Sequence, residues 1–563
     1  RTQSERNRVQ LQPLPPKRGL IYDRNGVLLA DNRPSYLLSI VVERVDDLEA
    51  TLAEVAELLP VSETDVANFR KKLARRRPYE AVPLRFRLTD EERARLAVNR
   101  YRLPGVVVDA QLLRYYPHGE LFSHALGYVG RINEREVLFL DETDYRGTFH
   151  VGKVGVEKFY EDVLHGDVGY QNVETNAHGR VMRVLERHDP LPGADLVLHL
   201  DMRVQQAAFD ALGDRRGAVV ALDPRTGGVL ALVSTPGFDT NLFVNGISTR
   251  DYSALRDSLD VPLFNRAIQG QYPPGSTVKP MMGMAGLESG LVTPEYTVPD
   301  PGWYQLPGDS RRYRDWILRI RGGGHAPHVD LNMAIAESCD VYFYDLARRL
   351  TIDGMHDFLS PFGLGTRTGV DTTSERPGVL PSTRWKRDAM AQPWYPGETL
   401  SAGIGQGYML ATPMQLAMAT SVMASRGQRH VPRLLKSVNG EPVPAPELEA
   451  LRGAEENWQA VHRGMLEVVH GSRGTARKLA DGIQYQMAGK TGTAQVIGIA
   501  QNAVYREEEV AERHRHHGLF IAFAPAEAPT IAVAIIVENG GGSGAASPIA
   551  RQVIDTWLLG SPG

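Results

Sequence analysis

The sequence predicts an α+β protein of two parts, a mixed N-terminal domain over residues 1–195 and a larger C-terminal domain over residues 196–563. Two observations support this fold class. The length of 563 residues exceeds that of a typical single domain. In the second part, strand patterns gather near the two ends, with a mainly helical stretch between them. This order predicts an antiparallel sheet that is assembled from both ends of the segment and flanked by helices.

The N-terminal part alternates short strand and helix patterns. An Asn25-Gly26 turn separates two strand patterns, and Pro60 separates two segments whose apolar residues have helical spacing. The predicted elements are strands at 27–30, 36–43, 105–109 and 112–116, helices at 46–59 and 89–99, and a hairpin over 168–187. We find no group of residues in this part that indicates catalysis.

The C-terminal part opens with a helix at 201–212 and a hairpin, whose strands at 217–222 and 229–234 flank a turn-rich tip. Much later, the runs at 519–523 and 530–537 are almost wholly apolar, which is typical of central strands buried on both faces. A strand that starts near Gln484 and a helix at 545–559 complete the predicted set.

The composition, 42% apolar and 23% charged residues, is that of a soluble globular protein. The net charge of −4 gives no reason to expect nucleic acid as a partner. The single cysteine, Cys339, excludes an intrachain disulfide. The longest apolar run, Ile531 to Val537, is far shorter than the roughly 18 residues of a membrane span. Because the chain opens at Arg1 on a polar lead, we expect an N-terminal membrane anchor that is absent from this chain.

Ser276 and Lys279 form the first candidate catalytic pair. The breakers Pro-Pro-Gly at 273–275 precede them and a helical run follows, so the two side chains share one face of a helix start. A serine needs a base to become a nucleophile. A lysine serves as that base only if its pKa falls from about 10.4, which a helix N-terminus or a second cation favours. Taken alone, the pair fits an N-cap serine with a solvated lysine better.

Two further motifs change this balance. Ser338-Cys339-Asp340 lies in a helical pattern over 333–346, where Ser338 would relay a proton and Asp340 would hold a lysine or a substrate amide. Lys490-Thr491-Gly492-Thr493 ends the strand that starts near Gln484. A cation, two hydroxyls and a glycine at a strand edge suit a carboxylate-terminated substrate that lies alongside as an added strand. Taken singly, the motif at 338–340 could be a polar turn of a helix, and the motif at 490–493 could be a solvated strand end.

Together, and in this order, the three motifs resemble those of the penicillin-recognising serine transferases. Residues 18–26 and 152–157 look like sequence boxes of the class B penicillin-binding proteins, and the resemblance covers residues 14–559. Position 340 is an aspartate where most relatives have asparagine. In this respect the Ser338-Cys339-Asp340 motif resembles that of the penicillin-binding protein 2 group, the elongation transpeptidases of Gram-negative bacteria. An ionised aspartate accepts hydrogen bonds but donates none, so its contact with a substrate amide must differ from that of asparagine.

The resemblance implies a D,D-transpeptidase that cross-links peptidoglycan stem peptides ending in D-Ala-D-Ala during cell elongation and rod-shape maintenance, and that β-lactams acylate. Ser276 would attack the penultimate D-Ala carbonyl, Lys279 would be the base, and backbone N–H groups of Ser276 and Thr493 would form the oxyanion hole. Ser338 and Lys490 would relay the proton to the departing D-Ala. The implied catalytic residues are Ser276, Lys279, Ser338, Asp340 and Lys490, and the implied substrate-binding residues are Thr491, Gly492 and Thr493.

The resemblance implies no cofactor for catalysis but does imply a structural zinc. Aspartate, histidine and cysteine are zinc ligands, and four of them make a closed site. Three further histidines, His514, His516 and His517, lie in a charged loop after Lys490 and are expected to be solvated. A buried free cysteine with solvated histidines is the alternative to zinc. The ligands that match in order are Asp300, Asp315, His325 and Cys339, with His328 as a rival to His325.

The resemblance further implies a place on the periplasmic face of the inner membrane, held by a single-pass anchor. It implies two protein partners, a SEDS-family glycosyltransferase and a rod-complex scaffold protein, and a non-catalytic pedestal over residues 1–195. Three alternatives stay open: a D-Ala-D-Ala carboxypeptidase, a β-lactamase, and a non-catalytic β-lactam sensor or scaffold. The sequence shows no base for deacylation, which argues against a β-lactamase, and the complete motif set argues against a dead site.

Overall fold

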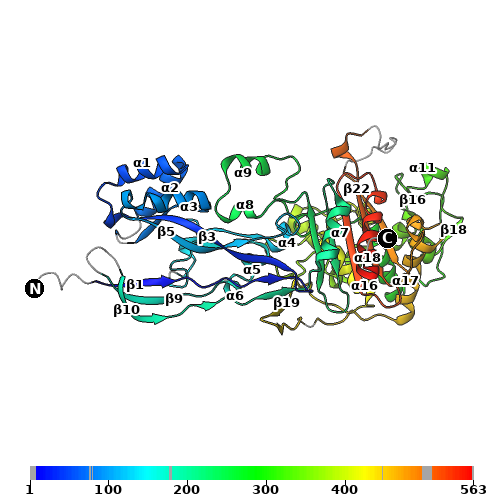
Figure 1. Cartoon of the computed structure of the whole chain (residues 1–563). Coiled ribbons are helices and arrows are strands. Elements are labelled where there is room, and N and C mark those ends of the chain that lie inside the picture. Colours follow the sequence, from blue (N-terminus) through cyan, green and yellow to red (C-terminus); the bar gives the residue numbers. More distant parts are fainter. Residues whose placement is uncertain are drawn as a thin grey trace, which may run out of the picture.

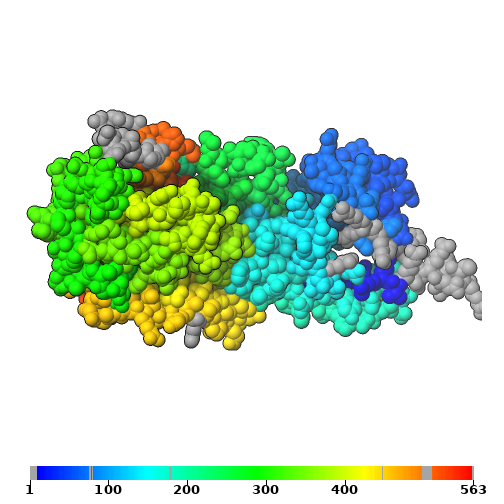
Figure 2. All heavy atoms as spheres, turned by 180° about the vertical axis from the view of Figure 1, so that it is seen from behind, coloured from blue at the N-terminus to red at the C-terminus, as the bar shows by residue number. Residues whose placement is uncertain are grey.

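The computed structural model describes residues 8–74, 78, 80–141, 143–175, 181–446, 448–496 and 510–560. The molecule is elongated, with the N-terminal strands at one end and the C-terminal sheet and helices at the other (Figure 1). Figure 2 shows the same elongated outline from behind. Over these residues, no helix combines the length and the apolar character that a membrane crossing requires.

The tip of the N-terminal lobe is built on two long strands. β3 (Leu28–Val41) pairs antiparallel with β5 (Val106–Tyr115), from Asp31 opposite Tyr115 to Ile40 opposite Val106. β4 (Ala81–Arg85) also pairs with β3. The helices that pack here are α1 (Leu48–Leu58), α2 (Glu63–Leu73) and α3 (Asp90–Val98), and their shared core contains Leu38, Ile40, Val55 and Phe69.

The two long strands correct the sequence prediction of four shorter ones. The strands expected at 27–30 and 36–43 are one strand, β3, and those expected at 105–109 and 112–116 are one strand, β5. The residues between the apolar runs of β3 are polar, and they lie at partly or fully exposed positions. Backbone pairing carries the strand through them, which a pattern of apolar residues does not report.

A second sheet joins β1 (Arg8–Leu14), β9 (Gly169–Thr175) and β10 (Val181–His188). β9 and β10 confirm the hairpin predicted over 168–187, and residues 176–180 between them lie outside the described part of the chain. Shorter elements link the two sheets to the rest of the chain: β2 (Ile21–Tyr22), α4 (Ser123–Leu126), β6 (Tyr128–Arg131), β7 (His150–Val154), α5 (Gly155–Phe159), α6 (Glu161–His165), β8 (Gly166–Asp167) and β11 (Leu191–Pro192).

A buried cluster of ion pairs holds the middle of this lobe. The fully buried carboxylate of Glu157 accepts hydrogen bonds from Arg18 at 2.6 Å and from Arg114 at 2.6 Å. Arg18 also donates to Glu161 at 2.8 Å. Buried charges are stable only when they are paired, so this cluster ties the segment before β2 to β5, α5 and α6. It also brings together the two sequence boxes at 18–26 and 152–157.

Strands from both parts of the chain share one sheet. β12 (Leu196–Leu198) lies between β2 and β19 (Leu435–Val438), in the order β20-β19-β12-β2-β3-β4 with β20 at Glu441–Pro442. The N-terminal lobe is therefore joined to the C-terminal lobe by backbone pairing as well as by the chain. The division between residues 195 and 196 stays a prediction.

The C-terminal lobe contains the predicted antiparallel sheet, in the order β14-β13-β23-β22-β21. Its strands are β13 (Gly217–Leu222), β14 (Val229–Thr235), β21 (Ala488–Ala494), β22 (His517–Ala524) and β23 (Ile531–Val537). α7 (Met202–Leu212) and α18 (Ser547–Leu559) pack together against it, as do α16 (Pro413–Ala424) and α17 (Glu455–His470). The prediction of a sheet built from both ends of the segment is confirmed.

The stretch between β14 and β21 is mainly helical, as predicted. It carries two small two-stranded sheets, β15 (Val298–Pro299) with β18 (His328–Val329) and the hairpin β16 (Trp303–Gln305) with β17 (Arg312–Arg314). Its helices before α16 are α8 (Asn241–Val244), α9 (Thr249–Arg256), α10 (Lys279–Glu288), α11 (Leu318–Arg321), α12 (Leu331–Ala336), α13 (Asp340–Leu359), α14 (Thr383–Met390) and α15 (Pro396–Gly403).

The prediction of three solvated histidines is wrong for two of them. His514 is exposed, but His516 is buried and its Nδ1 accepts a hydrogen bond from the backbone N–H of Val496 at 3.2 Å. His517 begins β22, and its Nδ1 accepts from the backbone N–H of Asn539 at 2.9 Å. β22 thus starts earlier than its apolar run.

Candidate active site

Ser276 lies where a short 3-10 helix, Gly275–Val278, runs into α10. The predicted helix start is confirmed, and the Ser276 side chain is half-buried. Gly275 has φ +54°, and a Cβ at this position would lie 2.5 Å from the carbonyl oxygen of Thr493. Glycine is required here because of both the left-handed backbone and this close approach. The turn that carries Ser276 therefore lies directly against β21.

Lys279 is fully buried at the start of α10 and connects two of the three motifs. Its Nζ donates to the Ser338 carbonyl oxygen at 2.8 Å, to Ser338 Oγ at 3.2 Å and to Asp340 Oδ1 at 2.6 Å. Of the two roles that the sequence suggests for Asp340, contact with the lysine is the one seen here. These three acceptors hold the Lys279 side chain between α10 and the Ser338 motif.

The Ser338 motif corrects the helix expected over 333–346. α12 ends at Ala336 and α13 begins at Asp340, so Ser338 and Cys339 occupy a break between two helices. Ser338 has φ +61°, an uncommon backbone conformation for a residue with a Cβ. The break turns the Ser338 carbonyl oxygen toward Lys279 Nζ and toward the indole N–H of Trp316, which donates to it at 3.1 Å. Strain of this kind is common at functional sites.

Lys490 to Thr493 lie in β21, the edge strand of the sheet, and reach its next-to-last residue, as predicted to within one residue. The strand begins at Ala488, later than the predicted start near Gln484. Gly492 faces the Ser276 turn, because a Cβ there would lie 2.7 Å from Thr277 Cγ2. The hydroxyl of Thr491 is 2.8 Å from that of Thr475, and the carbonyl oxygen of Thr493 accepts from Gln406 Nε2 at 2.8 Å. The motif thus borders the nucleophile turn along the free edge of the sheet, as substrate addition to that edge requires.

Lys490 is also fully buried, and its Nζ donates to the Thr491 carbonyl oxygen at 3.1 Å. Burial, and then the charge of Lys279, lower the pKa of Lys490 well below its usual range, while Asp340 opposes the shift. Lys279 and Lys490 are therefore close enough for the charge of one to affect the pKa of the other. A lowered pKa favours the neutral amine, the form of Lys490 that can accept a proton.

A buried group of metal-ligand residues lies directly behind the Ser338 motif. One ligand atom each from Asp300, Asp315, His325 and Cys339 lies within 4.8 Å of the others, and all four residues are buried. His325 Nδ1 lies 3.0 Å from Asp300 Oδ2 and 3.7 Å from Asp315 Oδ2, and Cys339 Sγ lies 3.6 Å from Asp300 Oδ2. The rival, His328, is exposed in β18 and lies outside this group.

This group is linked to the active site through Asp315. The backbone N–H groups of Asp340 and Val341 donate to Asp315 Oδ2 at 2.6 Å and 3.3 Å. Burial, and then the charge of Asp340, raise the pKa of Asp315 to about 6. Burial and the charges of Asp315 and Asp300 raise the pKa of the Cys339 thiol well above its usual range. A bound cation would lower these pKa values, because it would stabilise the ionised carboxylate of Asp315 and the thiolate of Cys339.

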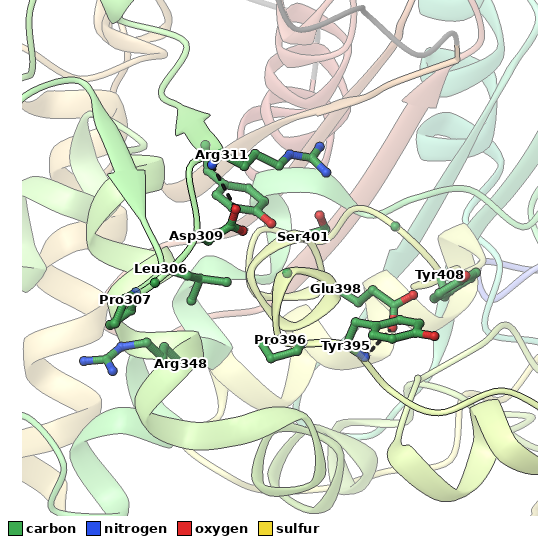
Figure 3. A pocket seen from close by; sticks show the side chains of 14 residues that line it. Leu306, Pro307, Asp309, Arg311, Arg348, Tyr395, Pro396, Glu398, Ser401 and Tyr408 are labelled. Atoms are coloured by element: carbon green, nitrogen blue, oxygen red, sulfur yellow. Dashed lines mark hydrogen bonds between the residues drawn. The ribbon is translucent and has the colours of Figure 1, made fainter.

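Two further features border the site, a glycine-rich loop at 401–407 and a pocket. The loop after α15 reaches the nucleophile turn, because the Gly275 N–H donates to the Gly405 carbonyl oxygen at 2.8 Å. Beside it lies a cavity of about 790 Å³, which we call the side pocket, lined by residues that include Arg311, Tyr313, Arg348, Glu398, Ser401 and Tyr408 (Figure 3). These residues come from segments far apart in the chain, so no local pattern signals the pocket.

The chain matches two family models, the "Penicillin binding protein transpeptidase domain" over residues 217–555 and the "Penicillin-binding Protein dimerisation domain" over residues 13–198. It is 47% identical to the peptidoglycan D,D-transpeptidase MrdA of Acinetobacter baumannii, over 99% of this chain and 83% of that protein. It is 43% identical to the MrdA protein of Escherichia coli K12, over 99% of this chain and 89% of that protein.

Solved structures agree with this relationship. The crystal structure of Pseudomonas aeruginosa PBP2 in complex with WCK 5153 has a TM-score of 0.76 and 44% identity, and the match covers 98% of this chain and 97% of that one. The complex between PBP2 and MreC from Helicobacter pylori has a TM-score of 0.85 and 31% identity, covering 99% and 100%. The chain therefore belongs to the penicillin-binding proteins, in the group that includes the MrdA peptidoglycan D,D-transpeptidases.

Proposed function

We propose that this peptidoglycan D,D-transpeptidase forms its acyl-enzyme on Ser276, with Lys279 as the base. Ser276 Oγ attacks the penultimate D-Ala carbonyl carbon of a stem peptide, and Lys279 takes the hydroxyl proton. The C–N bond to the terminal D-Ala breaks, and Ser338 and Lys490 deliver a proton to the departing amine. An amine of a second stem peptide then displaces Ser276 and completes the cross-link.

The remaining groups of the site bind and polarise the substrate. Backbone N–H groups of Ser276 and Thr493 form the oxyanion hole, a contribution of a few kcal/mol in comparable sites. Thr491 and Thr493 hold the terminal carboxylate, and Gly492 allows close approach of the backbone. Asp340 keeps Lys279 in place, consistent with the 2.6 Å contact between them.

The observation that carries this proposal is the buried Lys279. Its Nζ reaches Ser338 and Asp340 directly, and its charge lowers the pKa of the equally buried Lys490. Groups from three motifs that are distant in sequence are thus coupled to one amine, which lies one helix turn after Ser276, and this arrangement supports the proposed acyl transfer.

The proposal is tested by intact-protein mass spectrometry after brief exposure to benzylpenicillin. We expect one adduct per chain that persists for hours after free drug is removed, and none on Ser276→Ala. An adduct that disappears quickly with drug turnover would indicate a β-lactamase. No adduct on the unmodified protein would indicate a sensor or scaffold.

We further propose that Asp300, Asp315, His325 and Cys339 hold a structural zinc. Ligands of a tetrahedral zinc at about 2.0–2.3 Å lie roughly 3.3–3.7 Å apart. Three contacts among these residues, at 3.0, 3.6 and 3.7 Å, are close to that range, and all four ligand atoms lie within 4.8 Å of one another. A cation also suits two carboxylates and a thiol that are buried together. When bound, zinc would stabilise the break that carries Ser338, and it has no part in the acyl-transfer steps.

The cellular setting follows from the relatives. We propose that the protein acts on the periplasmic face of the inner membrane, held by an N-terminal anchor, with residues 1–195 as a pedestal and residues 196–563 as the transpeptidase domain. A rod-complex scaffold and a SEDS-family glycosyltransferase are the proposed partners, supported by the Helicobacter PBP2–MreC complex and by a structural relative, 30% identical with a TM-score of 0.74, from a peptidoglycan synthase complex. Co-purification of the full-length protein from membranes with both partners tests this.

A further inference from the structure

We propose that the side pocket binds the acceptor stem peptide, the strand whose amine resolves the acyl-enzyme. The pocket is a cavity of about 790 Å³ between the loop of the β16–β17 hairpin and helix α15. This inference rests on the proposed function, and it specifies where the second substrate lies. Figure 3 shows Arg311 at the top of the view, Arg348 at the lower left, and Tyr395, Glu398 and Tyr408 toward the right.

The hairpin wall of the pocket is continuous with the Ser338 motif. Arg311 and Tyr313 line the pocket, and Asp315 and Trp316 follow them in the chain. Asp315 Oδ2 accepts from the Asp340 N–H at 2.6 Å, and the Trp316 indole donates to the Ser338 carbonyl oxygen at 3.1 Å. A ligand held by this hairpin therefore lies only a few residues from the proposed proton relay.

The opposite wall is continuous with the nucleophile turn. Ser401 and Gly407 line the pocket, and the residues between them contact the acylation site. Gly405 accepts from the Gly275 N–H at 2.8 Å, and Gln406 Nε2 donates to the Thr493 carbonyl oxygen at 2.8 Å. Because one loop separates the pocket from Ser276 and Thr493, a peptide bound in the pocket can extend its amine to an ester on Ser276.

The charges of the pocket suit an anionic peptide. The exposed Arg311 and Arg348 line it together with one half-buried acidic residue, Asp309. The other acidic residue, Glu398, is paired with the buried Lys386, so its charge is already neutralised. Guanidinium groups match the planar geometry of carboxylates and bind them with two hydrogen bonds. The free carboxylates of a stem peptide match this arrangement.

The pocket wall around Glu398 is held by contacts with the buried Lys386. Lys386 Nζ lies 5.7, 4.6 and 5.4 Å from the ring centroids of Trp394, Tyr395 and Tyr408. Glu398 also accepts from the Tyr395 N–H at 2.9 Å. A buried cation among three aromatic rings keeps the wall rigid, so a ligand is bound without reordering it.

In the step that this pocket would serve, the acyl group passes from Ser276 to the acceptor amine. The acceptor amine nitrogen forms an amide bond with the ester carbonyl carbon, and the bond between that carbon and Ser276 Oγ breaks. One proton leaves the nitrogen and ends on Ser276 Oγ. No oxidant, reductant or further reactant is needed.

The test compares Arg311→Glu with Arg312→Glu, a matched charge reversal on the neighbouring residue. Arg312 does not line the pocket, and its guanidinium lies 4.2 Å from the ring centroid of Trp303. The donor is an acyl-D-alanyl thioester. The acceptor is a soluble stem tetrapeptide with a free side-chain amine, used with its carboxylates free or amidated. Transfer is expressed per acyl-enzyme formed by each variant.

We expect Arg311→Glu to raise the KM for the free-carboxylate acceptor on the order of tenfold, since a reversed charge at a binding site costs about that factor. The KM for the amidated acceptor should change much less, and Arg312→Glu should behave as the unmodified protein. Equal acceptor KM values in all three proteins, or equal losses for both acceptors, would overturn the inference. If the unmodified protein forms no acyl-enzyme on Ser276, the proposed function fails instead.

Discussion

The substitution Gly405→Ala tests whether the loop after α15 positions the nucleophile Ser276. Gly405 belongs to none of the three motifs. Its φ is +70°, and a Cβ at this position would lie 2.2 Å from the Gly275 carbonyl oxygen. Cβ contacts below 3.0 Å essentially do not occur, so Gly405→Ala must open this contact by at least about 0.8 Å. Gly275 precedes Ser276 directly, and a misplacement of about 1 Å can cost on the order of 100-fold in rate. We therefore expect acylation by benzylpenicillin to slow about 100-fold.

Gly290→Ala is the matched control for backbone strain. Gly290 has φ +66° at the end of α10, and no atom lies within 4 Å of a Cβ built there. Both variants carry the left-handed penalty of about 1–2 kcal/mol, but only Gly405→Ala has the clash. The assay is the second-order rate constant for acylation by a fluorescent penicillin, with thermal unfolding measured alongside. Acylation of folded Gly405→Ala within twofold of Gly290→Ala would refute the reasoning.

Three further predictions concern metal, charge and pH. Cys339→Ser should lose bound zinc by metal analysis of untagged protein and unfold at a lower temperature, and full retention of zinc would contradict the proposed site. Glu157→Gln removes the carboxylate that pairs with the buried Arg114 and one of the two that pair with Arg18, so the free energy of unfolding in urea should fall by about 3–5 kcal/mol, whereas Arg70→Ala, which removes an exposed ion pair, should cost below about 1 kcal/mol. Burial lowers the pKa of His124 to about 4 from 6.5, so stability from its neutral form is present above pH 6.5 and is lost as the pH falls toward 4. His124→Gln should reduce that acid loss in unfolding measured between pH 7 and pH 4, and an unchanged pH profile would contradict this origin.

The sequence predicts those parts of the site that depend on short, local patterns. The Pro-Pro-Gly breakers place Ser276 at a helix start, and the apolar runs of β22 and β23 mark the centre of the sheet. The order of the three motifs, through a family resemblance, places Lys279, Ser338 and Asp340 together, as the structure confirms.

Other features depend on backbone conformation or on distant contacts. The helical pattern continues through Ser338, because the periodicity of apolar residues does not report a single left-handed residue. The long strands β3 and β5 continue through polar residues because they pair with each other. The side pocket joins residues from 306 to 408, and no spacing rule connects them. Spacing also could not choose between His325 and His328, which burial distinguishes.

The central claim is that the protein joins two stem peptides through an ester on Ser276. The most direct measurement is product analysis by liquid chromatography and mass spectrometry, with glycan-linked stem peptides as substrate and Ser276→Ala as control. We predict cross-linked peptide dimers with the unmodified protein and none with Ser276→Ala. Trimmed peptides without dimers would identify a carboxypeptidase, and dimers formed by Ser276→Ala would contradict the assignment of the nucleophile.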